Sequence, residues 1–143
     1  MNICPIMIQG GMGVYISNPK LARTVSMLST PERPTLGVLS GVALERVLTR
    51  LLQKGGVGAD NIMRVLRNCP LLYSIAEGIF CKYYNNPSAG TPVFSVEPSR
   101  HLIELTICAN YAFVTLAKEE HNNPVGINYL EKIQTPRLPE ILG

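Results

Sequence analysis

The amino-acid sequence predicts an α/β domain in which short parallel strands alternate with helices. Three features lead to this prediction. An apolar run at 5–8 ends in a glycine-rich turn and is followed almost at once by a helix-start signal. A second apolar run, at 35–40, precedes the most regular amphipathic pattern of the chain, and a third, at 125–130, follows a long apolar segment. Strands that alternate with helical patterns are typical of parallel sheets.

The first strand leads into three glycines clustered around a methionine within 10–13. Asn18 then provides an N-cap, and Pro19 occupies the first helical position, where its missing N–H costs nothing. Glycines in such a turn let the backbone adopt positive φ and approach a flat or phosphorylated ligand closely. The same glycines also fit a tight strand-to-helix turn that binds nothing, and the residues alone leave both interpretations open.

The next two elements are a helix and a buried strand. The helix is predicted to have a single apolar face, because four apolar residues recur at helical spacing: Leu21, Ala22, Val25 and Leu28. Two prolines within 30–34 end it. Residues 35–40 are then apolar on both sides, as expected of a parallel strand covered by helices, and Gly41 closes this strand.

Successive helices without an intervening strand are predicted for the middle of the chain. The first covers 44–54 and ends at Gly55 and Gly56, with five residues on its apolar face: Leu44, Val47, Leu48, Leu51 and Leu52. A second helix is predicted to begin at an Asp60 cap, and a third to cover 72–84. These helices form an insertion relative to a plain strand-helix repeat.

A long helix at 98–120 and a strand at 125–130 complete the predicted elements. The helix is apolar nearly all round, so we expect it to be buried on more than one side. In an isolated fragment part of that surface would be exposed. This favours a homo-oligomer or a missing remainder of the domain to cover it.

Composition excludes several classes of function. The net charge of +3 comes from basic residues spread along the chain, without a dense run or interleaved aromatics, which argues against nucleic-acid binding. The four cysteines form no CxxC pair and predict reduced thiols rather than a metal site. No stretch is apolar over the ~20 residues that a membrane span needs, and no secretory leader is evident. We therefore expect a cytoplasmic protein.

The segment PIMIQGGMGVYISNPKLARTVS resembles the amino-terminal strand and first helix of the nitronate monooxygenase family, flavin-dependent (β/α) barrel enzymes formerly called 2-nitropropane dioxygenases. Residues 37–44 are similar to the family's second strand and the turn after it, and 121–134 to a later strand. The resemblance implies a partial (β/α)8 TIM barrel with its helices outside. A complete barrel needs about 250 residues. The 143 residues are therefore expected to be the amino-terminal part of a single FMN-binding barrel domain, 1–143.

The resemblance also implies where the cofactor FMN binds. In such barrels the working residues lie at the carboxyl ends of the strands. Family counterparts of Gly11, Met12 and Asn128 contact FMN. The neighbouring strand ends and one following cation complete the expected cofactor-binding set: Gln9, Gly10, Ser40, Gly41 and Lys132. Lys132 would place a positive charge near the N1–C2=O end of the flavin, although an exposed loop lysine is the commoner interpretation.

The catalytic residues are not identified by this comparison. The family's phosphate-binding loops and its catalytic histidine lie beyond a point equivalent to Gly143. Neither His101 nor His121 matches that histidine, and both have structural interpretations beside helix ends. The expected parent activity is that of a flavoprotein oxidoreductase, a monooxygenase that oxidises small alkyl nitronates with O2.

Three alternatives remain open at this stage. A flavin-dependent enoyl-thioester reductase of the same superfamily would share the cofactor and use NAD(P)H. A truncated module without catalysis would act, if at all, as an interaction protein. A flavodoxin-like or Rossmann-like domain is disfavoured, because the glycines lack GxGxxG spacing and no acidic residue follows the second strand.

Overall fold

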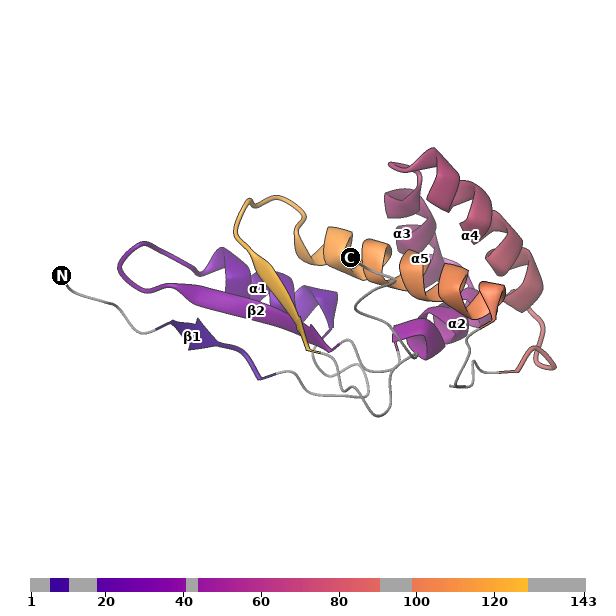
Figure 1. Cartoon of the computed structure of the whole chain (residues 1–143), viewed down its shortest axis with the longest axis horizontal. Coiled ribbons are helices and arrows are strands. Elements are labelled where there is room, and N and C mark those ends of the chain that lie inside the picture. Colours follow the sequence, from indigo (N-terminus) through magenta and orange to yellow (C-terminus); the bar gives the residue numbers. More distant parts are fainter. Residues whose placement is uncertain (1–5, 11–17, 41–43, 91–98, 129–143) are drawn as a thin grey trace. The chain divides into compact units, whose positions relative to one another are not determined.

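The computed structural model describes residues 6–10, 18–40, 44–90 and 99–128. The chain divides into two compact units. The sheet unit comprises Met1–Val42 and Phe113–Tyr129, and the helical unit comprises Ala43–Ala112 and Leu130–Gly143. Within the described ranges the elements are three strands and five helices (Figure 1).

The sheet unit contains three parallel strands in the order β1-β2-β3, which confirms the predicted α/β class with parallel strands. β1 (Met7–Ile8) pairs with β2 (Thr35–Ser40), and β2 pairs with β3 (Val125–Asn128). The described strands form an open sheet, and no closed barrel is seen among them.

Helix α1 (Pro19–Met27) begins as the sequence predicts. Asn18 Oδ1 accepts a hydrogen bond from Leu21 N at 2.9 Å, and Pro19 is the first helical residue. The predicted apolar face is confirmed for Ala22, which is buried, but is wrong for Leu21 and Leu28, which are 39% and 66% exposed. The buried stripe of α1 is instead made of small residues: Pro19, Ala22 and Ser26.

The small stripe is explained by how closely α1 approaches β2. A Cβ built on Gly37 would lie 1.9 Å from the Ala22 carbonyl oxygen and 2.7 Å from Ser26 Oγ. Helix and strand therefore meet backbone to backbone at this point. A large side chain on the buried stripe of α1 would hold the helix away from the strand, so Leu21 and Leu28 face outward.

Ser26 links α1 to both neighbouring strands of the sheet unit. Its hydroxyl accepts a hydrogen bond from Gly37 N and donates one to the Pro124 carbonyl, both at 2.9 Å. The Ser26 carbonyl accepts a third bond from Asn123 Nδ2 at 2.8 Å. Because Pro124 immediately precedes β3, these bonds fix the start of β3 against α1.

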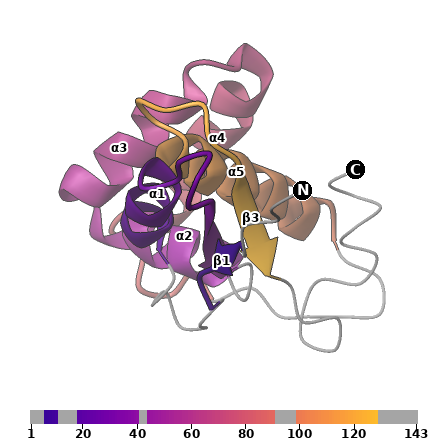
Figure 2. The ribbon, with the colours of Figure 1, turned by 90° about the vertical axis from the view of Figure 1, so that its left-hand side faces the viewer.

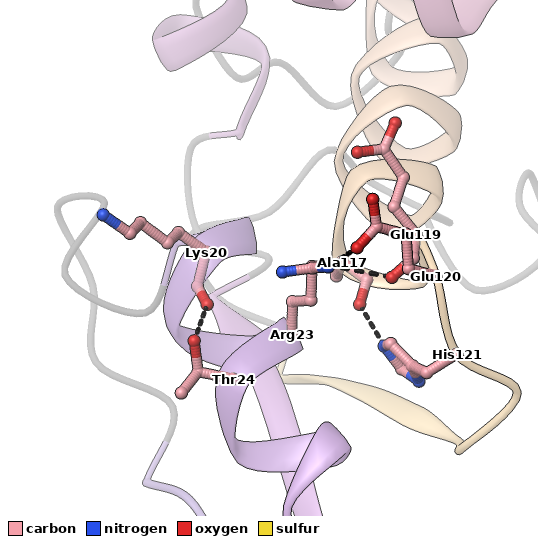
Figure 3. Close-up of polar contacts among 7 residues, drawn as sticks. All are labelled: Lys20, Arg23, Thr24, Ala117, Glu119, Glu120 and His121. Carbon is pink, nitrogen blue, oxygen red and sulfur yellow. Dashed lines mark hydrogen bonds and ion pairs between the residues drawn. The ribbon is translucent and has the colours of Figure 1, made fainter.

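A hydrogen bond and an ion pair of Arg23 join α1 to the turn after α5 (Figure 3). Arg23 Nε donates to the Glu119 carbonyl at 2.9 Å, and its Nη2 pairs with Glu120 at 2.6 Å. His121 Nε2 donates to the Ala117 carbonyl at 2.7 Å, and its Nδ1 accepts a hydrogen bond from Asn123 N at 3.1 Å. Glu120 is largely exposed, so its ion pair contributes about 1 kcal/mol at most.

The helical unit is built from four helices, and α3 and α4 lie side by side in both views (Figures 1 and 2). They are α2 (Leu44–Lys54), α3 (Gly56–Leu66), α4 (Pro70–Tyr83) and α5 (Arg100–Ala117), whose residues from Phe113 onward belong to the sheet unit. The first three were predicted as successive helices without a strand between them, and this is confirmed. The core includes three fully buried leucines of α2: Leu44, Leu48 and Leu52.

The predicted start of the second helix at Asp60 is wrong. α3 begins four residues earlier, and Asp60 is an exposed residue within it. Gly55 and Gly56 have φ of +67° and +74°, conformations that favour glycine, so the chain turns sharply and resumes helix at once. At Gly55 a Cβ would also lie 2.6 Å from the Tyr84 ring.

α5 is as apolar as the sequence predicts. Ser99 Oγ accepts a hydrogen bond from Leu102 N at 3.1 Å and so caps the start of the helix. Leu105, Ala109 and Phe113 have no exposed surface. No helix in the described parts of the chain is long and apolar enough to span a membrane.

Candidate functional site at the carboxyl end of the sheet

The two faces of the sheet can be told apart by two glycines. Gly37 faces α1, so Val38 and Ser40 face the other way. A Cβ on Gly126 would contact Val38 Cγ2 at 3.4 Å, which places Gly126 on the face opposite α1. Asn128 is two residues further along β3 and therefore shares that face.

Ser40 and Asn128 are register partners at the carboxyl ends of β2 and β3. They project from the same face, and the backbones of paired strands are about 4.8 Å apart. Ser40 is 1% exposed, and its Oγ has no hydrogen-bond partner among the described residues. Asn128 is partly exposed. The structure thus brings together two of the residues that the sequence predicts for cofactor binding.

Gln9 lies just beyond β1 and continues its pairing by a side chain. Gln9 N donates to the Leu36 carbonyl at 3.0 Å, while Gln9 Oε1 accepts from Val38 N at 3.1 Å. The side-chain carbonyl of Gln9 thus accepts the hydrogen bond that the next backbone carbonyl of β1 would accept from β2. The pairing of β1 with β2 therefore continues through a side chain where the backbone pairing ends. Gln9 Nε2 is buried and has no partner among the described residues.

The remaining predicted site residues are less defined. Gly10 is exposed. Gly11, Met12, Gly41 and Lys132 lie outside the described residues. The prediction that these residues contact a cofactor therefore stays a prediction.

The described strand ends present uncharged hydrogen-bonding groups. An amide nitrogen at Gln9 and a hydroxyl at Ser40 are both buried, and neither has a hydrogen-bond partner among the described residues. A buried group that stays unpaired costs about 1–3 kcal/mol. Native proteins rarely leave these groups unpaired without a functional or structural reason. A neutral, planar ligand edge with alternating acceptors and donors suits such a set.

A third buried polar atom without a partner among the described residues belongs to the helical unit. Glu45, in the first turn of α2, is 1% exposed, and its Oε1 is unpaired. Burial raises the pKa of this carboxyl above its usual 4.5, against smaller lowering effects of its backbone N–H and of Arg46. Glu45 was not predicted as a buried residue, because hydrophobic spacing along α2 does not by itself indicate that a carboxylate is buried.

Replacing Glu45 by glutamine is expected to stabilise the protein at neutral pH. Because the folded state holds the carboxyl proton more tightly, the stability linked to Glu45 is complete below pH 4.5 and is lost as the pH rises through the raised folded pKa. Thermal unfolding of Glu45→Gln should show a gain of about 1 kcal/mol at neutral pH that shrinks toward pH 4.5. A pH-independent difference would contradict a titrating Glu45.

His101 is paired with a buried tyrosine of the helical unit. Its Nε2 is 2.9 Å from Tyr83 Oη, and Tyr83 is 2% exposed. Burial lowers the pKa of His101 from 6.5, with a further lowering by Lys82 and an opposing effect of Glu104. The imidazole is therefore neutral near pH 7 and serves as a hydrogen-bond partner for a buried phenol.

No three His, Cys, Asp or Glu side chains gather into a metal-binding group within the described ranges. No family model, no curated protein and no solved structure matches the chain.

Proposed function

We propose that the carboxyl end of the sheet binds FMN and that the chain belongs to a flavin-dependent oxidoreductase resembling nitronate monooxygenase. The main support is the buried Ser40 hydroxyl, which has no partner among the described residues and lies beside the register partner Asn128. A second support is the glycine-rich sequence that follows Gln9 in the chain. Ligands of parallel α/β sheets bind at this end of the strands.

Each side chain has a chemical role in this proposal. Ser40 Oγ can donate or accept, the Asn128 amide offers both functions, and Gln9 Nε2 donates only. Together they would hold and orient the uncharged pyrimidine edge of the isoalloxazine. Bound FMN would supply two-electron chemistry between a small nitronate substrate and O2.

Replacing Ser40 by alanine separates a binding role from a structural one. A structural hydroxyl would have a partner, whereas Ser40 Oγ has none among the described residues. We expect Ser40→Ala to weaken FMN binding about fivefold, the effect of one hydrogen bond of ~1 kcal/mol, without lowering the unfolding temperature. Fluorescence titration with FMN and thermal unfolding measure the two effects.

Ser74→Ala is the matched control, because Ser74 is an exposed serine of α4 in the helical unit. This control should change neither FMN affinity nor stability. Unchanged FMN affinity of Ser40→Ala, or a loss of stability with no effect on FMN, would contradict the proposal.

The reaction is tested by two assays on the FMN-loaded protein. Nitronate-dependent O2 uptake would support the monooxygenase proposal. NADH-dependent reduction of an enoyl thioester would support the sister reductase activity instead. Activity in neither assay would leave binding without catalysis and favour a non-catalytic module.

An exposed apolar strand favours self-association as the second candidate function. Ile6, Met7 and Ile8 are 62%, 68% and 63% exposed, and β1 lies at an edge of the described sheet. Exposed apolar edge strands pair readily with other chains. A second copy, or the remainder of a barrel, would cover this edge.

Met7→Lys tests this second candidate. A charge on the edge strand should prevent pairing, so sedimentation would show a dimer for the unmodified chain and a monomer for the variant. Val57→Lys is a suitable control, because Val57 is 78% exposed on α3 of the helical unit. A monomeric unmodified chain would exclude self-association through β1.

A further inference from the structure

Two cysteines of the helical unit lie around one helix junction. Cys69 occupies the turn between α3 and α4, and Cys108 is a residue of α5 with no exposed surface. Cys69 is partly exposed. Both are free thiols, and the FMN site proposed above involves neither of them.

Cys108 lies near the chain on both sides of Cys69. Its Sγ lies 3.9 Å from the carbonyl oxygen of Leu72, in the first turn of α4. It also lines the same apolar core as Leu66, the last residue of α3. Leu66 and Leu72 are the third residues before and after Cys69, so Cys69 lies within the segment that packs against Cys108.

Backbone hydrogen bonds hold this junction compact. Cys69 N donates to the Leu66 carbonyl at 3.0 Å, and Tyr73 N donates to the Cys69 carbonyl at 2.9 Å. The Cys69 backbone is therefore tied to both segments that flank Cys108. A disulfide requires the two Cα atoms to lie about 4.4–6.8 Å apart, and it requires the Cys69 side chain to turn toward Cys108.

We propose that Cys69 and Cys108 form an oxidisable pair, which a low-molecular-weight disulfide converts into an intramolecular disulfide that joins the start of α4 to α5. The partly exposed Cys69 thiolate attacks the small disulfide, which releases one small thiol and leaves a mixed disulfide on Cys69. The Cys108 thiolate then attacks Cys69 Sγ and releases the second small thiol. Both protein thiol protons pass to solvent or to the departing thiolates.

The second step is expected to be slow and strongly pH-dependent. Burial raises the pKa of the Cys108 thiol to about 11, with further increases from the nearby charges of Glu104 and Cys69. The reactive thiolate is therefore a minor form at neutral pH. The rate of ring closure should rise about tenfold per pH unit below that pKa, because the thiolate fraction does.

The experiment uses the Cys4→Ser/Cys81→Ser chain, which retains only the two proposed partners. It is incubated with glutathione disulfide under native conditions and followed by intact mass and by thiol titration. We expect the mass to fall by that of two hydrogen atoms, with loss of both thiols and a higher unfolding temperature. Lasting glutathione addition, or formation of the bridge only in denaturant, would overturn the proposal.

Variants of each partner separate the two steps. With Cys108→Ser the mixed disulfide on Cys69 should persist, and with Cys69→Ser the buried Cys108 should stay unmodified. Cys108→Ala serves the same purpose where the serine variant does not fold. A Cys69→Ser chain that reacts as fast as its parent would also overturn the proposal.

Discussion

Alanine at Gly37 is expected to destabilise the sheet unit more than any other small substitution described here. The added Cβ would lie 1.9 Å from the Ala22 carbonyl oxygen and 2.7 Å from its carbonyl carbon. Both are backbone atoms of α1, so no side-chain rotation relieves the overlap, and the helix must move away from β2. We expect Gly37→Ala to cost about 3 kcal/mol or more in urea unfolding.

Gly126 is the control for this prediction, because it is also a strand glycine of the sheet unit. A Cβ there would meet the side-chain ends of Val38 and Leu36 at 3.4 and 3.5 Å, and the Gly37 carbonyl oxygen at 3.8 Å, which is ordinary van der Waals contact. Gly126→Ala should therefore change the free energy of unfolding by less than about 1 kcal/mol. Similar losses for both variants would show that α1 and β2 do not approach each other as described.

Alanine at Ser26 is expected to have the second-largest effect. The hydroxyl pairs with Gly37 N and the Pro124 carbonyl, and Ser26 has no exposed surface. Its removal leaves a buried N–H without its partner, which should lower the free energy of unfolding by about 2 kcal/mol. The Asn123 contact is retained, because it uses the Ser26 backbone carbonyl.

Thr24→Ala provides the comparison on the same helix. The Thr24 hydroxyl is exposed and bonds only the Lys20 carbonyl one turn earlier (Figure 3). Its removal should change stability by less than about 0.5 kcal/mol. Equal urea midpoints for Ser26→Ala and the unmodified chain would contradict the role assigned to Ser26.

Features that depend on neighbouring residues could be predicted from the sequence. Asn18 and Pro19 determine the start of α1 by local chemistry, and the leucine spacing of α2 places its buried face. The apolar run at 35–40 predicted a buried strand, because a continuous apolar segment of that length indicates a strand covered on both faces. The pairing of Ser40 with Asn128 was expected only as a shared strand end, because register depends on contacts between distant segments.

Features that depend on distant contacts were missed. The outward position of Leu21 follows from the close approach at Gly37, which no helical periodicity encodes. Gln9 was predicted as a ligand. The additional role of its Oε1, which replaces a backbone carbonyl in the sheet, was not predicted because it depends on where β2 lies. Burial of Glu45 likewise depends on packing that hydrophobic spacing does not determine.

FMN retention by the purified chain tests the central claim most directly. The chain is mixed with FMN, separated from the excess by gel filtration, and its absorbance spectrum is recorded at the elution volume. Our account predicts a flavin band that elutes with the protein and is weakened in Ser40→Ala but not in Ser74→Ala. A colourless protein peak would contradict the proposal that the carboxyl end of the sheet is a flavin site.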